Sequence, residues 1–165
     1  MTVSVPADVL SRLKAVLGEG GWSQDPEVLA PKLLEWRDRW SGETPFLALP
    51  NSTAEVSAIV GICFESGTPI TPQGGNTGLV GGQIPQGEIL LSTDRLRAIR
   101  EIDTFDDVLV AEAGVKLAAV HGAVKRPSDR TRWWMHPAIV RHINRVVCGE
   151  PIDGPHSGFN RLLRE

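Results

Sequence analysis

The stretch from Thr71 to Gly82 reads TPQGGNTGLVGG and places five glycines within twelve residues. Glycine has no Cβ and adopts positive φ readily, so a backbone rich in it lets successive N–H groups converge on anionic oxygens. Asn76 and Thr77 add side-chain donors. Composition alone fits a flexible surface loop equally well, and the surrounding sequence must separate the two interpretations.

Two common phosphate-binding loops are excluded by the positions of their key residues. A Walker-type loop ends in Gly-Lys-Ser/Thr, but no lysine lies between Lys32 and Lys116. The dinucleotide fingerprint needs glycines at i, i+2 and i+5, a pattern that the glycines at 74, 75, 78, 81 and 82 never meet. The loop therefore predicts neither of these two NAD or ATP sites.

The residues before the loop predict a strand, a helix and a second strand. Phe46–Leu49 is a short apolar run, Pro69–Thr71 is a second expected strand, and between them Ser52 and Glu55 form a capping box at a helix start. Gly67 is a natural helix end. This order predicts a βαβ unit with parallel strands. The helix residues expected to face the core are Val56, Ile59, Val60 and Cys63.

Elements on either side complete an α+β pattern. Pro6–Leu17 has the apolar spacing of an amphipathic helix, and a second helix is expected to begin at Asp25–Pro26. Trp36 and Trp40 lie four residues apart and are expected to share a face. After the loop we expect strands over 88–92, 99–102 and 108–111, a helical turn over 94–98 and a helix over 116–124.

Composition predicts an ordinary cytoplasmic chain whose two ends differ in charge. The 165 residues are 41% apolar, with neither a membrane-length apolar run nor the start of a signal peptide. Cys63 and Cys148 are expected to be reduced thiols. Residues 1–124 carry a net charge of −7, and residues 125–165 carry +4. This step near Val124 marks a domain boundary, a nucleic-acid-binding tail or a join between unrelated coding sequences.

The string PQGGNTGLVGG at 72–82 closely resembles the pyrophosphate loop of FAD-linked oxidases with the vanillyl-alcohol oxidase type of flavin-binding domain. Within these it is most similar to the D-lactate, D-2-hydroxyglutarate and glycolate dehydrogenases. Ordered segments on both sides agree, including ILLSTDRLRAIREID at 89–103 and VAEAGV at 110–115. The resemblance covers roughly residues 25–124 and implies the first lobe of that domain, a small mixed sheet with flanking helices.

The resemblance also implies a cofactor, a site and a reaction. FAD is expected along the loop, and the family reaction is hydride transfer from a 2-hydroxy acid to the flavin. No catalytic or metal-binding residue is assigned, because the family's catalytic groups lie in later parts of its members. The expected cofactor contacts are Pro72, Gln73, Gly74, Gly75, Asn76, Thr77, Gly78, Leu79, Gly81 and Gly82.

The resemblance ends near Val124, and this break predicts three segments. They are an N-terminal helical segment (1–24), a partial FAD-binding domain (25–124) and a basic tail of unknown origin (125–165). We expect a truncated dehydrogenase reading frame that continues into unrelated sequence, able to act on a 2-hydroxy acid only when the missing part is supplied. The alternative is a catalytically inactive protein that at most binds FAD, a nucleotide or a partner.

The tail supports only weak functional hypotheses. Its basic residues surround Trp133 and Trp134, a combination that can bind nucleic acid. However, Pro137–Val147 also fits a helix whose arginines form the solvated face, and this interpretation is favoured. The spacings among His136, His142, Cys148 and His156 do not fit a zinc site. We therefore expect a helical tail with no metal, no membrane contact and no nucleic-acid partner.

Overall fold

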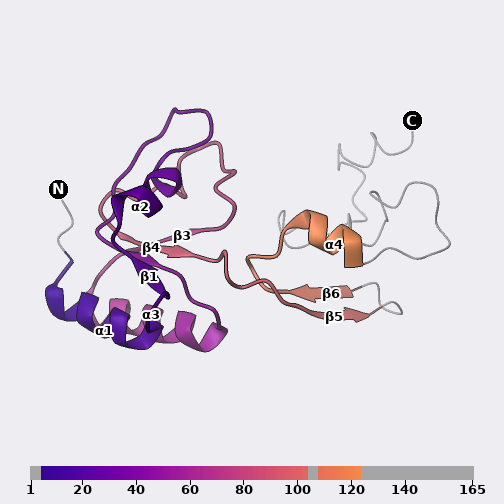
Figure 1. The fold of residues 1–165 in the computed structure, drawn as a ribbon, viewed down its shortest axis with the longest axis horizontal. Helices are drawn as coiled ribbons and strands as arrows, with labels where there is room; N and C mark the ends of the chain where they lie inside the picture. The colour runs from indigo at the N-terminus through magenta and orange to yellow at the C-terminus, as the bar shows by residue number, and fades with distance from the viewer. Residues whose placement is uncertain (1–4, 104–107, 124–165) are drawn as a thin grey trace, which may run out of the picture. The chain divides into compact units, whose positions relative to one another are not determined.

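The computed structural model describes residues 5–103 and 108–123 (Figure 1). These residues divide between two compact units. The first unit contains the described residues up to Ala98, together with Glu112–Lys116. The second contains Ile99–Ala111 and the described residues from Leu117 onward. The predictions for the tail, including the helix over 137–147 and the histidine positions, lie outside the described residues.

The first unit is built on a four-stranded mixed sheet. Its strands are β1 (Trp22–Ser23), β2 (Leu47–Ala48), β3 (Ile70–Gln73) and β4 (Ile89–Ser92), in the spatial order β1-β2-β4-β3. β1 runs antiparallel to β2, whereas β4 runs parallel to both β2 and β3. The α+β class and the mixed sheet expected from the sequence are therefore confirmed.

The predicted βαβ unit forms, but its two strands are not neighbours. β2 and β3 run in the same direction on either side of helix α3 (Thr53–Ser66) in sequence, with β4 hydrogen-bonded between them in space. All four residues of β4 are buried, and a strand covered on both faces suits the centre of a sheet. The apolar run Ile89-Leu90-Leu91 therefore takes the inner position.

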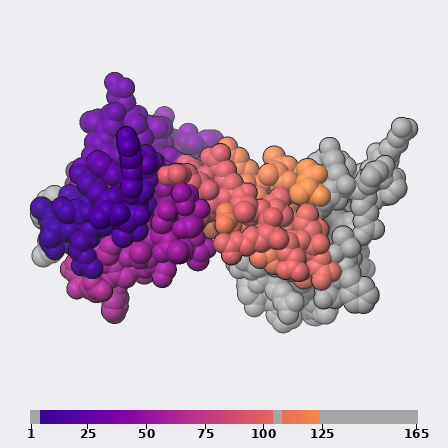
Figure 2. Space-filling model, turned by 60° about the horizontal axis from the view of Figure 1, so that its bottom comes forward, coloured from indigo at the N-terminus to yellow at the C-terminus, as the bar shows by residue number. Residues whose placement is uncertain are grey.

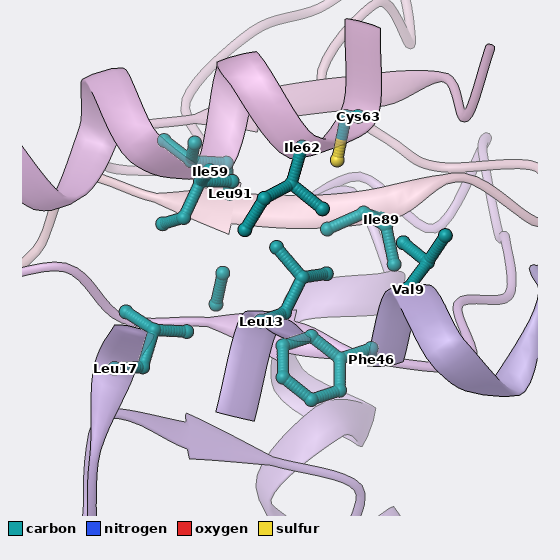
Figure 3. Packing of buried hydrophobic residues seen from close by; sticks show 10 residues of the cluster. Val9, Leu13, Leu17, Phe46, Ile59, Ile62, Cys63, Ile89 and Leu91 are labelled. Atoms are coloured by element: carbon teal, nitrogen blue, oxygen red, sulfur yellow. The ribbon is translucent and has the colours of Figure 1, made fainter. Parts of the chain in front are cut away.

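Helices cover both faces of this sheet. Helices α1 (Ala7–Leu17) and α3 pack together on one face, where Figure 3 shows Leu13, Ile62, Phe46 and Ile89 directed toward one another. Helix α2 (Pro26–Leu33) lies on the opposite face, where its Leu29 packs in a second cluster with Leu47 and Leu90. Successive strand residues thus enter opposite layers, as the twofold alternation of a strand requires.

Helix α3 confirms the predicted ends but not the whole predicted buried stripe. The Ser52 hydroxyl accepts a hydrogen bond from Glu55 N–H (3.2 Å), and Gly67 ends the helix in the left-handed conformation. The Glu55 carboxylate accepts from Asn51 N–H (2.8 Å). Val60 is 47% exposed, so its predicted burial is wrong, and Ile62 is buried instead.

The outer faces of α1 and α3 form part of the unit's surface (Figure 2).

The second unit contains a β-hairpin and a short helix. β5 (Ile99–Asp103) pairs antiparallel with β6 (Val108–Ala111), as predicted, and α4 spans Leu117–Ala123. The helical turn predicted over 94–98 is a single turn at Asp94–Arg95 in the first unit. Among the described residues, no helix is both long enough and apolar enough to span a bilayer.

Candidate functional site

The glycine-rich segment leaves the sheet at the edge where its parallel strands end. β2, β4 and β3 all point their carboxyl ends toward this edge, and the Thr93 N–H donates to the Gln73 carbonyl (2.9 Å), which extends the β3–β4 pairing. In open sheets with parallel strands, ligands bind outside the carboxyl ends of the strands. The fold therefore places the predicted loop at a position suited to binding.

The five glycines of the loop fall into two groups when a Cβ is built on each. At Gly78 it would lie 2.4 Å from Gln83 Oε1, and at Gly81, where φ is +78°, it would lie 2.7 Å from the Trp40 ring. At Gly74 and Gly75 the nearest atoms are 3.7 and 3.8 Å away, and at Gly82 nothing lies within 4 Å. The chain itself thus favours glycine at 81, a side chain at 78 would displace the end of the Gln83 side chain, and space is open at 74, 75 and 82.

The backbone of this loop also carries unused donors. Within residues 5–103 and 108–123, no acceptor takes the N–H groups of Gly74 to Gly82. Successive N–H groups in a turn conformation can point together at an anion when the protein itself does not use them. No residue of the loop is charged. The loop can therefore hold an anion through main-chain donors without a lysine or a metal.

Two of the predicted cofactor contacts, Gln73 and Asn76, use their side-chain amides inside the protein. Gln73 is buried, and its Nε2 donates to the carbonyls of Lys32 (2.8 Å) and Gln83 (3.0 Å). Asn76 has a left-handed backbone (φ +54°), and its Nδ2 donates to the Leu34 carbonyl (2.8 Å). Both side chains hold the loop against the end of α2.

Residues 34–42 form a second wall of the site that the sequence did not predict. The Glu35 N–H donates to the Trp40 carbonyl (2.9 Å) and Leu34 bridges to Ser41, so this segment is a tight loop. Because no helix forms here, Trp36 and Trp40 do not share a helical face as predicted. Trp40 instead lies against Gly81. The pattern of two tryptophans four residues apart was misleading because no helix forms.

Glu35 is the most unusual polar residue of this wall. Its side chain is fully buried, with Oε2 accepting a long hydrogen bond from Arg39 N–H (3.4 Å). No donor reaches its Oε1 from the residues that the structure describes, and the same holds for Gln73 Oε1. A buried polar atom without a partner costs about 1–3 kcal/mol, so both atoms mark a region with unmet hydrogen-bonding capacity beside the loop.

One ion pair lies just after the end of β4. Lys32 Nζ contacts the Asp94 carboxylate, and both side chains are mostly buried. Burial raises the pKa of Asp94, but the hydrogen bond and charge of Lys32, with smaller contributions from Ser92 and Arg97, outweigh it and lower that pKa below its ordinary value of 3.8. In this pair the positive charge of Lys32 and the negative charge of Asp94 neutralise each other.

This pair predicts a pH-dependent contribution to stability. Replacing Asp94 by asparagine is expected to lower the free energy of unfolding at pH 7 by about 1 kcal/mol or less. Because the folded-state pKa is depressed, the contribution is present above the unfolded-state value and is lost as pH falls through the folded-state value. Urea unfolding of both proteins between pH 7 and pH 2 measures this. A difference that persists once Asp94 is protonated would contradict the assignment.

A known domain family and its members match this chain in sequence. The model of the FAD binding domain family matches residues 44–129. A probable D-2-hydroxyglutarate dehydrogenase from Oryza sativa subsp. indica is 38% identical over 112 residues, covering 67% of this chain and 20% of the relative. The D-2-hydroxyglutarate dehydrogenase from Bos taurus is 38% identical over 117 residues, covering 70% and 21%. The chain thus spans about a fifth of the length of these curated relatives.

Solved structures match the fold at lower identity. An alkyldihydroxyacetonephosphate synthase has a TM-score of 0.66 at 16% identity, covering 75% of this chain and 28% of that protein. The 4-ethylphenol oxidase from Gulosibacter chungangensis has a TM-score of 0.64 at 24% identity, covering 75% and 26%. These likenesses confirm the expected vanillyl-alcohol oxidase type fold.

The sequence relatives confirm the resemblance to D-2-hydroxyacid dehydrogenases. The prediction of a flavin cofactor was based on that resemblance. The family match begins before the glycine-rich loop and extends to residue 129. It includes the loop, the sheet edge and the open positions at Gly74, Gly75 and Gly82. Because it takes in more than half of the 165 residues, the chain belongs to the FAD binding domain family, and its cofactor is FAD.

Proposed function

We propose that this chain supplies the pyrophosphate-binding part of the flavin site in an FAD-dependent dehydrogenase of D-2-hydroxy acids. The observation that carries the proposal is the set of unpaired N–H groups from Gly74 to Gly82, at the carboxyl edge of a partly parallel sheet. An FAD diphosphate carries only acceptor oxygens, and main-chain donors suit it without a metal. The predicted contacts at Pro72 to Leu79, Gly81 and Gly82 belong to this proposal.

The residues around the loop fit a diphosphate sterically as well as chemically. Side chains are absent at Gly74, Gly75 and Gly82, where the protein has room for them, so the open space is available to a ligand. No carboxylate lies in the loop, and Asp94 at its edge is neutralised by Lys32. These features remove the steric and electrostatic obstacles to a bound anion.

The names of two relatives, both D-2-hydroxyglutarate dehydrogenases, support the proposed reaction. Bound FAD supplies the acceptor of the hydride and its two electrons. This chain's described residues orient the cofactor, and we assign none of them to substrate binding or proton transfer. Action on a 2-hydroxy acid therefore requires residues outside the described part. A cytoplasmic location stays a prediction, since these two relatives carry mitochondrial names.

A ligand series tests the proposal directly. Titration of the purified chain is expected to show that FAD binds and that ADP competes with it, because both carry the diphosphate. Riboflavin, which lacks phosphate, is expected to bind far more weakly. Absorbance spectra after gel filtration and competition titrations measure these affinities. Equal affinity for riboflavin and FAD would overturn the assignment to the loop, and absence of FAD binding would overturn the proposed function.

A further inference from the structure

Three neutral amide side chains form a connected set of hydrogen bonds inside the glycine-rich loop. Gln73 Nε2 reaches the carbonyls of Lys32 and Gln83. Gln83 Nε2 donates to the Gly78 carbonyl (2.9 Å) and to Asn76 Oδ1 (3.2 Å). Asn76 Nδ2 then donates to the carbonyl of Leu34 (2.8 Å), two residues from Lys32. The set therefore begins and ends at the carboxyl end of α2.

These bonds join the two ends of the loop to its middle. Gln73 is the last residue of β3 and Gln83 lies ten positions later, so their bond closes the neck of the loop. From the far end, Gln83 reaches back to Gly78 and Asn76. Asn76 has a left-handed backbone, which asparagine adopts more readily than other residues with a side chain because its amide can form local hydrogen bonds. The amide set supplies such bonds.

The amide group suits this role better than a charged group does. A carboxylate at 83 would face the Gly78 carbonyl and Asn76 Oδ1 without a proton to donate, and would add negative charge beside a site for an anion. An amide supplies two donors at no net charge. It can therefore fix the shape of the loop while the N–H groups of Gly74 to Gly82 stay available.

We propose that Gln83, which lies just outside the predicted contact residues, is a positioning residue for the cofactor. It holds Asn76 and Gly78 so that the loop is ordered before FAD arrives, and its own side chain need not touch the ligand. Ordering a loop in advance removes part of the entropic cost of binding. This inference rests on the proposed function of the loop.

The test compares Gln83→Ala with the matched variant Gln86→Ala. Gln86 Nε2 also bonds a backbone carbonyl, that of Ser41 (3.1 Å), but among the described residues it forms no hydrogen bond with the amide set. We expect Gln83→Ala to weaken FAD binding about tenfold, the loss of roughly one net hydrogen-bond contribution. Gln86→Ala is expected to bind FAD as the wild type does. Thermal unfolding of both variants checks that the first unit remains folded.

A second measurement uses the protein without FAD. Leu79 and Val80 are exposed, so thermolysin can cut beside them once the loop leaves its ordered shape. We expect faster cleavage at this position in Gln83→Ala and unchanged cleavage elsewhere, which a general loss of stability would not produce. Wild-type rates of cleavage and wild-type FAD affinity in Gln83→Ala would overturn the inference. Wild-type protein that binds no FAD would overturn the proposed function instead, and the cleavage rates would still decide whether Gln83 orders the loop.

Discussion

Gly75→Val is expected to abolish FAD binding while the chain unfolds at the wild-type temperature. A Cβ at Gly75 meets only Thr77 Cγ2, at 3.8 Å, and the position has no positive φ, so the fold accepts a side chain there. The branched side chain would instead occupy the space above the unpaired N–H groups. Losing two hydrogen bonds to a charged ligand, at about 1.5–3 kcal/mol each, weakens binding by at least about 100-fold.

The matched control is Gly61→Ala on α3. A Cβ built on Gly61 meets nothing within 4 Å, and Gly61 lies outside the loop. Alanine in a helix interior is expected to stabilise the chain by about 0.5–1 kcal/mol and to leave FAD binding unchanged. FAD titration and thermal unfolding of both variants make the comparison. FAD affinity in Gly75→Val equal to that of the wild type would refute the assignment of the loop.

Local signals in the sequence were enough to predict most elements of the fold. The capping residues Ser52 and Asp25 mark helix starts, and Gly67 marks a helix end, because each acts on backbone groups within one turn. The place of β4 between β2 and β3 could not be predicted in this way, since it depends on pairing between residues about 20 to 40 positions apart. Val60 was misassigned because its apolar side chain lies on the outer face of α3.

The site shows the same division between local and long-range information. The glycine density placed the loop, and the family match agrees with that position. The sequence could not separate Gly75 from Gly81, because the difference is the Trp40 ring, which lies 41 positions earlier in the chain. Gln83 and Glu35 were missed for a similar reason. The hydrogen bonds of Gln83 form only when the loop folds back on itself, and Glu35 is buried only in the folded 34–42 segment.

Gly42→Ala is expected to destabilise the first unit more than any other single substitution proposed for it. A Cβ at Gly42 would lie 1.9 Å from the backbone oxygen of Pro85 and 2.7 Å from Ile84 Cγ2. Neither neighbour moves easily, because the Pro85 carbonyl also accepts from Glu43 N–H (3.0 Å) and both residues are buried. Overpacking of this kind costs about 1–3 kcal/mol and occasionally more.

Thermal unfolding monitored by circular dichroism measures this effect. A loss of 2–3 kcal/mol in a unit of roughly 100 residues lowers Tm by about 10–20 °C. Gly82→Ala is the matched control within the same region, since a Cβ at Gly82 meets nothing within 4 Å, and its Tm is expected to equal that of the wild type. Wild-type Tm in Gly42→Ala would mean that the segment ending at Gly42 does not approach Pro85. The 34–42 wall, and with it the support for Asn76 and Gly81, would then have to be placed elsewhere.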